Sequence, residues 1–504
     1  MDFLILTPPV MPSSEPPSGA FMLSSALMGQ GYSTGFFDLS LEFYYRHFKK
    51  SPQLKTVNRA LHYFNKSKKG YTPDHHRGHS GTIHKDLKRF SADFEGWRLT
   101  AMDIEAPIPV HNVEPLKNLL QKQNPFADFF DEVIPDKIAL HRPKKIIVSV
   151  AYLSQLAGAI ALNSYLQSIG ITAIFGGSLF RSLKSTGNGF DFLTAIFKNI
   201  DVSNGSTLIF EKEQSDFLNR LHYPTIISDH EYIGLKPVFP LTLSIGCYYS
   251  SCLFCPDRDM KFSNVAIKAI DDFLNSFPKT SKRPLIHLLD SAIPINRFRD
   301  FLPVAKSHKI DFYGFARPEK RLSSDNLLTE ASQSGLTMLQ LGVENGNHNL
   351  LNRYNKGIDP IESQKIMRLS AEAGIKNYIY MLFGLPGETT KDNMETLEFL
   401  NKNSVYIDFF NLSIFNLPSC SELTTRAEEF NIRTDNFKNS KDAISLYKPF
   451  TVNGKDPRHQ ARDFIQNHIY TNKTLKQKIN QTPRWFRAAH LAMMDIENRK
   501  KVII

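Results

Sequence analysis

The chain has 504 residues, of which 41% are hydrophobic, and a net charge of +11 at pH 7. This length allows two or three domains. No apolar stretch approaches about 18 residues, so we expect neither a signal peptide nor a transmembrane helix. Four cysteines are too few for a disulfide framework and favour a reducing, cytoplasmic location.

The first 40 residues predict the beginning of a parallel α/β sheet. A buried strand over 3–7 is followed by the proline-rich loop PPVMPSSEPPSG, a helix over 20–28 and a second strand over 33–39. The apolar spacing changes from the strand period to the helix period and back again, as in a βαβ unit.

Residues 41–140 interrupt this sheet with a polar, aromatic-rich and mostly helical pattern. His75, His76 and His79 lack the regular spacing of a helical metal site, so we predict an exposed loop there. The stretch between residues 48 and 90 is basic and includes Lys66, Lys68 and Lys69. We favour a solvated surface over contact with an acidic peptide or a nucleic acid, because no aromatic-interleaved binding motif accompanies the charge.

The sheet resumes with a strand over 145–150, a helix over 154–168 and the strand ITAIFGGS. Glycines at the carboxyl end of a parallel strand let the backbone approach a large ligand closely. A plain Rossmann-like turn would give the same signal. The candidate ligand-binding residues at these strand ends are Ser149, Gly176, Gly177 and Ser178.

Three of the four cysteines follow a short predicted strand over 241–245 that ends at Gly246. Cys247, Cys252 and Cys255 have the spacing C-x4-C-x2-C. Three thiolates on one loop can bind three irons of a [4Fe–4S] cluster and leave the fourth iron open to a small ligand. The alternative is a zinc site completed by Cys420, although structural zinc sites usually present paired C-x2-C knuckles.

Strand and helix patterns alternate after the cysteines. Further strands are predicted over 284–289, 310–316, 337–345, 378–383 and 408–415. With the strand before the cysteines they make six, as in a partial (β/α)6 barrel, whose active residues lie at the carboxyl ends of the strands. The candidates at these ends are Asp290, Arg317, Glu344, Gly384, Pro386 and Cys420.

The cysteine motif, with Phe254 before its last cysteine, resembles that of the radical S-adenosylmethionine (radical-SAM) superfamily, although the usual first gap is one residue shorter. The segments GVENGNHNLLNRYNKG and YMLFGLPGET resemble a further superfamily pattern. The N-terminal order of elements, ending in the GG strand, is similar to the cobalamin-binding domain that precedes many radical-SAM barrels. The histidine motif of other cobalamin carriers is absent, so we expect no histidine below the cobalt.

This resemblance implies roles for individual residues. The three cysteines would bind the cluster, and Glu344 would hydrogen-bond the ribose of S-adenosylmethionine (AdoMet) with its two oxygens. Asp290 would lie near the methionine ammonium group. Arg317 would bind the AdoMet carboxylate or a substrate acid, or form a structural ion pair. Gly384 and Pro386 would shape a loop against the adenosine, while Cys420 would donate hydrogen, ligate weakly or simply pack.

The predicted organisation is a Rossmann-like cobalamin-binding domain over 1–215 with the helical insert, a radical-SAM barrel over 236–430, and a small helical cap over 431–504 that includes Trp485. The resemblance implies a methyltransferase that acts on an unactivated carbon or phosphorus of a natural product or peptide. It also implies an electron donor such as flavodoxin or ferredoxin. The alternatives are a radical rearrangement or cyclisation on the same cofactors and a zinc-stabilised binding protein.

Overall fold

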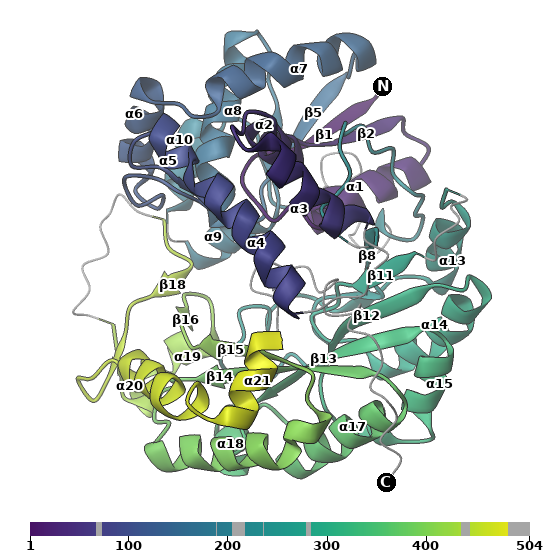
Figure 1. The fold of residues 1–504 in the computed structure, drawn as a ribbon, viewed down its shortest axis with the longest axis vertical. Helices are drawn as coiled ribbons and strands as arrows, with labels where there is room; N and C mark the ends of the chain where they lie inside the picture. The colour runs from purple at the N-terminus through teal and green to yellow at the C-terminus, as the bar shows by residue number, and fades with distance from the viewer. Residues whose placement is uncertain are drawn as a thin grey trace.

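The computed structural model describes residues 1–66, 73–187, 189–203, 217–234, 236–278, 284–434 and 444–481. Two parallel sheets lie side by side, each flanked by helices, with the N-terminal sheet at the top of the view in Figure 1. This is the predicted α/β class. Within the described ranges, no helix is long and apolar enough to cross a membrane.

The N-terminal sheet has the strand order β2-β1-β5-β6-β7. Its strands are β1 (Phe3–Thr7), β2 (Thr34–Asp38), β5 (Lys145–Ser149), β6 (Ile174–Gly176) and β7 (Ile200–Asp201). The helices α1 (Ser18–Gly29), α8 (Leu156–Ser168), α9 (Ser178–Thr186) and α10 (Phe190–Ile196) accompany them. β1 pairs in parallel with both β2 and β5, so the chain order reverses between β1 and β5. Ligands of such sheets bind at the carboxyl ends of the strands beside the reversal.

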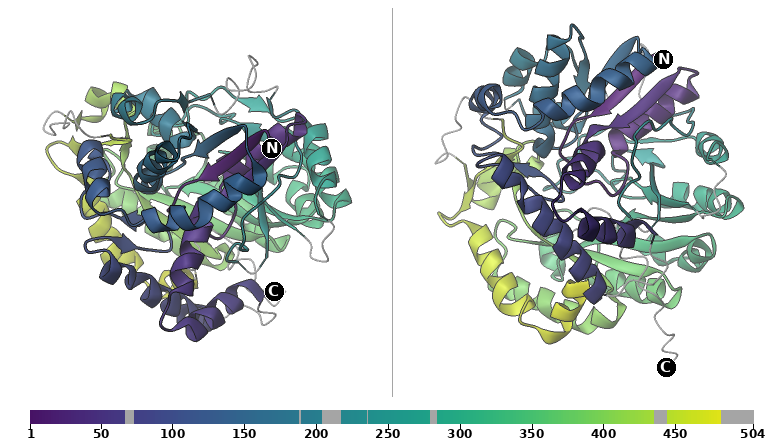
Figure 2. Two further views of the ribbon diagram at one scale, coloured as in Figure 1. Left: turned by 90° about the horizontal axis from the view of Figure 1, so that it is seen from above. Right: turned by 45° about the horizontal axis from the view of Figure 1, so that its top comes forward.

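The predicted helical insert lies between β2 and β5. It contains α2 (Leu39–Lys49), α3 (Leu54–Lys66), α4 (Pro73–Lys88), α5 (Phe90–Asp93), α6 (Val113–Lys122) and α7 (Ala127–His141), with the short strands β3 (Arg98–Leu99) and β4 (Ile104–Glu105). The pair α3 and α4 projects from the N-terminal half toward the second sheet (Figure 2).

The prediction of an exposed histidine loop is wrong, because His75, His76 and His79 belong to α4. Aromatic side chains of α3 cover two of them: His79 stacks on Tyr63 at 4.3 Å, and His76 meets the ring of Phe64 at 5.4 Å. Burial lowers the pKa of His76 to about 4. The predicted basic surface is only partly visible, since Lys68, Lys69 and the side chain of Lys66 lie outside the described residues.

The second sheet contains the six predicted barrel strands, all parallel, in the order β15-β14-β13-β12-β11-β8. They are β8 (Val238–Leu241), β11 (Leu285–Leu288), β12 (Asp311–Ala316), β13 (Leu336–Glu344), β14 (Lys376–Phe383) and β15 (Phe409–Ile414). The helices α13 (Ile267–Asn275), α14 (Ile295–Ser307), α15 (Leu327–Gln333), α16 (His348–Arg353), α17 (Pro360–Glu372) and α18 (Thr390–Asn403) connect them. The chain order in this sheet does not reverse, as in a partial barrel.

The strand before the cysteines lies earlier than predicted. The sheet strand is β8, and Pro240 is tolerated inside it because β8 is an edge strand. The residues predicted as its end form β9 (Ser244–Ile245), which pairs antiparallel with β10 (Ser263–Asn264). β9 and β10 flank the cysteine loop on both sides and fix its ends.

The described part of the C-terminal region packs partly against the barrel and partly beside the cysteine loop. It contains the short strands β16 (Leu417–Pro418), β17 (Ile432–Arg433), β18 (Tyr447–Lys448) and β19 (Thr451–Val452) and the helices α19 (Glu422–Thr425), α20 (Pro457–Phe464) and α21 (Lys473–Gln481). Phe464 and Leu475 join the hydrophobic core of the barrel. Trp485 and the rest of the predicted cap beyond residue 481 lie outside the described residues.

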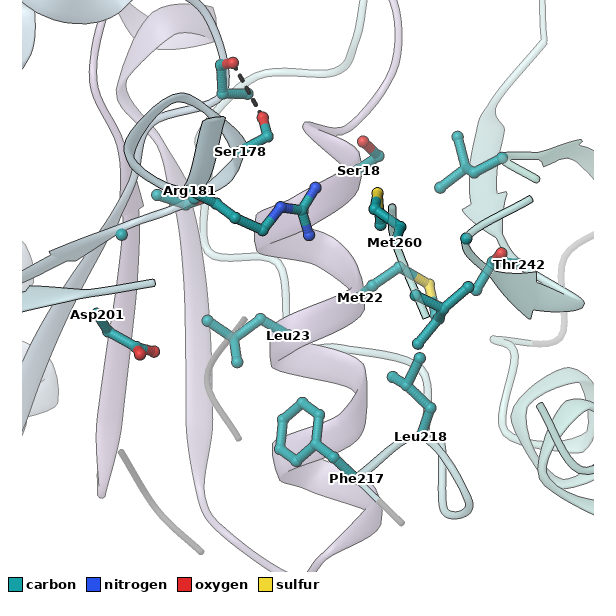
Figure 3. A pocket seen from close by; sticks show the side chains of 18 of the residues that line it. Ser18, Met22, Leu23, Ser178, Arg181, Asp201, Phe217, Leu218, Thr242 and Met260 are labelled. Carbon is teal, nitrogen blue, oxygen red and sulfur yellow. Dashed lines mark hydrogen bonds between the residues drawn. The ribbon is translucent and has the colours of Figure 1, made fainter. Parts of the chain in front are cut away.

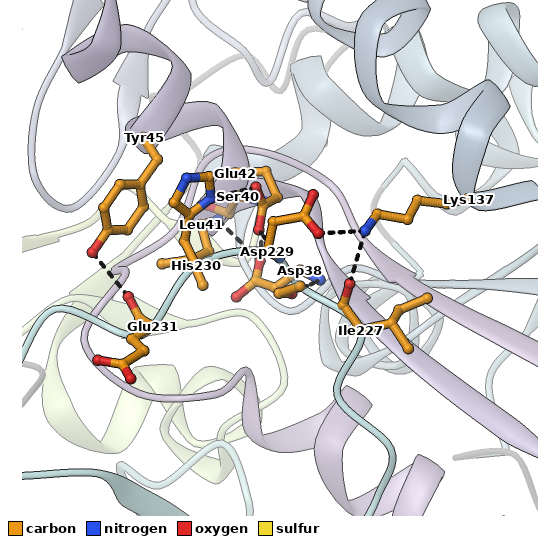
Figure 4. A network of polar contacts seen from close by, with 11 residues as sticks. Asp38, Ser40, Leu41, Glu42, Tyr45, Lys137, Ile227, Asp229, His230 and Glu231 are labelled. Atoms are coloured by element: carbon orange, nitrogen blue, oxygen red, sulfur yellow. Dashed lines mark hydrogen bonds and ion pairs between the residues drawn. The ribbon is translucent and has the colours of Figure 1, made fainter. Parts of the chain in front are cut away.

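The segment that joins the two halves is bound to the N-terminal sheet. The backbone N–H of Phe36 in β2 donates to Thr225, and that of Ile227 donates to Phe36, so the segment pairs with the edge of the sheet. Side chains strengthen this contact (Figure 4): Lys137 of α7 donates to the Ile227 carbonyl at 3.2 Å, and His230 lies 2.6 Å from Glu42 of α2.

Candidate functional site

A cavity of about 360 Å³ lies between the carboxyl edge of the N-terminal sheet and the start of the barrel. The N-terminal candidates Ser149, Gly176, Gly177 and Ser178 all line it. In Figure 3 the side chain of Arg181 extends from α9 across the cavity toward α1. The opposite wall comes from the barrel half and contains Thr242, Ser244, Ile245, Gly246, Asp257, Met260, Leu289 and Ser291.

The glycine pair is required by the backbone at the cavity edge. Gly177 has a φ of +114°, and a Cβ there would lie 2.4 Å from the carbonyl oxygen of Val150. A Cβ at Gly176 would lie 2.7 Å from the carbonyl oxygen of Asp201. Ser178 follows at the start of α9, where its hydroxyl donates to the Ala151 carbonyl at 3.0 Å. The sheet edge is therefore built from small residues in fixed positions.

A second cavity of about 520 Å³ adjoins the first and shares Arg181, Ile245, Asp257 and Met260 with it. Cys420 lines this second cavity, with its sulfur 3.7 Å from the Pro256 carbonyl beside the cysteine loop. Burial raises the pKa of Cys420. The described linings of the two cavities contain no histidine.

The cysteine loop begins directly at the first cavity, because Gly246 lines it and Cys247 is the next residue. All three cysteines are free thiols, with Cys252 buried. Burial raises the pKa of Cys255 to about 12, with a further increase from the charges of Asp257, Cys252 and Cys247. Among the described residues, no three His, Cys, Asp or Glu side chains gather closely enough for a single metal ion. A [4Fe–4S] cluster is held differently, by thiolates on separate irons.

Residues 354–357, which follow α16, hold this loop in place. The backbone N–H of Leu253 donates to the Tyr354 carbonyl at 3.1 Å. The side chain of Asn355 donates to the Ser251 carbonyl at 3.1 Å, and the Tyr249 hydroxyl donates to the Asn355 carbonyl at 2.9 Å. We call residues 354–357 the strap. It also brings Lys356 near the ring of Phe254, at 5.8 Å from the centroid.

Arg317 is buried at the end of β12, beside the cysteine loop. Its Nη1 lies 3.7 Å from the sulfur of Cys252, and its Nη2 donates to the Lys356 carbonyl at 2.5 Å. Both proposed partners of Arg317, the AdoMet carboxylate and a substrate acid, stay predictions. Arg317 also forms the predicted structural ion pair, at a long distance: its Nε lies 3.9 Å from a carboxylate oxygen of Glu319.

Asp290 is buried below the cysteine loop rather than open to a ligand. One of its oxygens accepts from the Leu243 backbone N–H at 3.0 Å, and the other accepts from the Ser244 hydroxyl at 2.5 Å. Burial raises its pKa to about 6. Asp290 therefore supports the entry into the loop through both of its oxygens, and its predicted place near the methionine ammonium group stays a prediction.

Glu344 ends β13 with a φ of +64° and pairs with Lys356 of the strap at 2.8 Å. Both side chains are largely buried, at 13% and 6% exposure. A Cβ at Gly342 would lie 3.0 Å from a Glu344 oxygen, so the glycine makes room for the pair. The contact uses one carboxylate oxygen of Glu344, Oε1, and the predicted hydrogen bond to the ribose stays a prediction. Sequence reasoning had not identified Lys356 as the partner.

The GLPGET segment is organised by Glu388, which the sequence analysis did not select. Its carboxylate accepts from the backbone N–H groups of Gly384 and Leu385 and from the side chain of Asn345. Burial raises the pKa of Glu388 to about 7. Gly384 itself faces α20, since a Cβ there would lie 3.2 Å from Ala461, and the Pro386 carbonyl accepts from the Tyr354 hydroxyl.

Glu15 was also missed, because it lies in the proline-rich loop far from the barrel in sequence. Its Oε2 lies 3.1 Å from His287 Nδ1 and accepts from the Tyr313 hydroxyl at 3.4 Å. His287 and Tyr313 alternate with residues that pack against the outer helices, so they face the barrel interior. The N-terminal half therefore contributes a carboxylate to the inside of the barrel. The side chains of His287 and Glu15 are 13% and 19% exposed.

No protein-family model matches the chain. A curated relative from Priestia megaterium, 4'-phospho-dehydrooxetanocin synthase, is 25% identical over 218 residues, which cover 38% of this chain and 29% of the relative. The solved structure of OxsB, a cobalamin-dependent S-adenosylmethionine radical enzyme with aqua-cobalamin and S-adenosylmethionine bound, aligns with 98% of this chain and 72% of its own at 14% identity, with a TM-score of 0.53. The methyltransferase TsrM from Kitasatospora setae aligns with 92% of this chain and 85% of its own at 11% identity, with a TM-score of 0.49.

The chain has the fold of the cobalamin-dependent radical-SAM enzymes. This conclusion rests on the alignment with OxsB, which extends over both halves and confirms the predicted fold class. The matched segment of the curated relative is less than a third of that protein. The roles of individual residues in this chain therefore rest on the geometry described above.

Proposed function

We propose that the protein is a cobalamin-dependent radical-SAM enzyme, most simply a methyltransferase for an unactivated carbon or phosphorus of a small molecule or peptide. The observation that carries this proposal is that the cavity at the N-terminal sheet adjoins the cysteine loop. Gly246 lines this cavity, and the next residue, Cys247, begins the loop. When bound, the cluster with AdoMet would supply a 5'-deoxyadenosyl radical and cobalamin would carry a methyl group.

The residues present fit these groups. Three thiols on one strapped loop form a donor set for a [4Fe–4S] cluster, and the carboxylate of Glu344 would suit a ribose hydroxyl through the oxygen that does not contact Lys356. The two adjoining cavities offer space for a large cofactor beside a small-residue sheet edge. Arg181 brings a positive charge to their shared wall, which suits the phosphate of the cobalamin tail.

The substrate would lie in the barrel interior, between Glu344 at one level and Glu15 at another. Gln340 donates to the Tyr380 hydroxyl at 3.2 Å in this interior, and Tyr380 contacts Phe315 at 5.5 Å between centroids. Carboxylates and hydroxyls on aromatic walls favour a compact molecule that carries hydrogen-bond donors. Glu15 would orient such a donor while it stays in contact with His287.

A radical rearrangement is the second candidate, and one observation favours it. The curated relative is named a synthase of 4'-phospho-dehydrooxetanocin rather than a methyltransferase. The two reactions require the same cofactor sites, so the described residues serve either one.

The test is anaerobic reconstitution with iron, sulfide and hydroxocobalamin, followed by metal analysis and reaction with AdoMet and dithionite. We expect about four irons and one cobalt per chain, and 5'-deoxyadenosine as a product. S-adenosylhomocysteine in addition would favour methyl transfer, and 5'-deoxyadenosine alone would favour rearrangement. Iron without retained cobalt would contradict a cobalamin-dependent reaction, and zinc in a colourless protein would contradict the whole proposal.

A further inference from the structure

Tyr249, Arg317 and Cys252 form a stack in which each member fixes the next; Arg317 and Cys252 are buried, and Tyr249 is half-buried. The guanidinium of Arg317 lies over the ring of Tyr249, with Cζ 3.5 Å from the centroid. Its Nη1 points at the sulfur of Cys252, 3.7 Å away. Arg317 is only 3% exposed, so water screens this charge weakly.

The strap closes the stack from the other side. Arg317 Nη2 donates to the carbonyls of Lys356 and Gly357, at 2.5 and 3.5 Å. The Tyr249 hydroxyl reaches the Asn355 carbonyl at 2.9 Å. Gly357 has a φ of +65°, and a Cβ there would lie 2.0 Å from the Tyr249 hydroxyl, so only glycine lets the ring enter.

The four-residue gap between the first two cysteines places the ring. Ser250 adopts a φ of +44°, its hydroxyl donates to the Cys247 carbonyl, and the Ser251 hydroxyl donates to the Tyr249 carbonyl at 2.8 Å. This tight turn directs Tyr249 toward β12. The ring of Tyr249 and the carbonyls of the strap hold the Arg317 guanidinium in one position. In that position Nη1 faces the sulfur of Cys252.

We propose that Arg317, held by Tyr249 and the strap, donates a charge-assisted hydrogen bond to the Cys252 thiolate and thereby raises the reduction potential of the cluster. The inference rests on the proposed function, since it requires a cluster on Cys252. A positive charge and a hydrogen bond at a cluster sulfur stabilise the reduced state, which carries one more negative charge. Arg317 is thus a positioning and tuning residue that acts through the cluster, and it needs no contact with substrate.

The test is the midpoint potential of the reconstituted cluster, measured without AdoMet so that no contact between Arg317 and AdoMet contributes. We expect Arg317→Met to shift the ratio of reduced to oxidised cluster about tenfold toward the oxidised form at a fixed potential, which corresponds to about 59 mV. Tyr249→Leu leaves the charge in place but removes its support, so its shift should have the same sign and be smaller. Arg299→Met, on the outer helix α14, is the matched control and should leave the potential unchanged.

An unchanged potential in a fully iron-loaded Arg317→Met protein would overturn the inference. If that variant does not retain iron, Tyr249→Leu decides the question: a lowered potential supports the tuning role, and a wild-type potential excludes it. A wild-type protein that binds no cluster would instead contradict the proposed function, so the two failures are distinguishable.

Discussion

The two sides of the candidate site are built in opposite ways. At the cysteine loop, specific polar contacts fix the chain: Asp290 supports the entry, the strap holds the middle and Arg317 reaches the sulfur of Cys252. At the edge of the N-terminal sheet, the cavity is lined by small side chains such as Ser149 and Gly176. Side-chain contacts therefore define the cysteine loop, whereas open space beside small residues defines the edge of the N-terminal sheet.

This difference matches the sizes of the two proposed ligands. A cluster and the amino-acid end of AdoMet are small and charged, so their positions depend on individual donors and charges. A large cofactor contacts many backbone atoms, so its binding depends mainly on room at a fixed sheet edge. We therefore expect substitutions at the loop to act through lost partners and substitutions at the sheet edge to act through lost space.

The largest effect should come from the loop. Cys252→Ala removes one of three proposed cluster ligands, and we expect it to lose nearly all reconstituted iron while it still retains cobalamin. Iron and cobalt per chain are measured together. Cys420→Ala is the control: it should keep its iron, whereas a zinc site completed by Cys420 would lose its metal in both variants.

The next largest effect should come from a larger side chain in the cavity at the edge of the N-terminal sheet. A Cβ at Gly19, in the first turn of α1, would meet only the Ser149 hydroxyl at 3.6 Å, so a larger side chain would extend into the cavity. We expect Gly19→Leu to weaken cobalamin binding about tenfold, or about 1.4 kcal/mol, without loss of iron. Gly78→Leu, where nothing lies within 4 Å of the new Cβ, should bind cobalamin normally. Equal cobalt in the two variants would place the cofactor elsewhere.

A similar but more selective loss is expected at Glu344. Glu344→Gln removes the charge that pairs with Lys356 and weakens acceptance from the ribose hydroxyls. AdoMet affinity, measured by equilibrium dialysis of the reconstituted protein, should fall about fivefold to tenfold, or about 1 kcal/mol. Glu372→Gln, which breaks an exposed pair with Arg368, should have no effect on AdoMet. Unaltered affinity in Glu344→Gln would remove Glu344 from the AdoMet site.

A last effect, on stability and not on ligand binding, is a pH dependence caused by Glu388. Its pKa is about 7 in the folded chain and 4.5 ordinarily, because burial disfavours the charge. The folded state therefore binds more protons between these pH values, and the free energy of unfolding falls as pH rises through that window, by about 3 kcal/mol in total. Asp38 and Asp290 act in the same direction, and His76, with its pKa lowered to about 4, acts in the opposite one.

The contribution of Glu388 is isolated by comparison with Glu388→Gln in chemical denaturation between pH 5 and pH 8. The slope of unfolding free energy against pH should be shallower in this variant than in the wild type. Glu428→Gln, at an exposed position, should keep the wild-type slope. Parallel slopes for all three proteins would show that Glu388 titrates normally.

Local sequence patterns predicted those parts of the structure that depend on neighbouring residues, namely strands and the cysteine loop. Five of the six barrel strands, the strand before the GG pair and the three-cysteine loop lie where periodicity and spacing placed them, with small shifts at their ends, whereas the strand before the cysteines lies earlier than predicted. The histidines of α4 were assigned to a loop, because the rings of Tyr63 and Phe64 that cover them come from a different helix. The GG pair did indicate a ligand site, and both glycines line the cavity, but the barrel residues that form its opposite wall could not be identified from that pair.

The missed residues share a physical cause. Glu15 acts more than 270 positions away from His287, Lys356 meets Glu344 across a turn, and Tyr249 matters through its contact with Arg317. None of these contacts has a fixed spacing in sequence, because tertiary packing creates them. For Glu388 a signal was present: it lies in the same GLPGET segment as Gly384 and Pro386, which were selected.

The strand-like pairing of Thr225 and Ile227 with Phe36 bears on how such a protein can be rearranged by recombination. The chain leaves the N-terminal half only after it has capped the open edge of that half's own sheet. A graft that exchanged the barrel together with this segment would leave the edge of β2 uncovered, and an uncovered edge strand pairs readily with other chains. The unit of exchange is therefore the N-terminal half plus the connecting segment through His230, whose contact with Glu42 completes it.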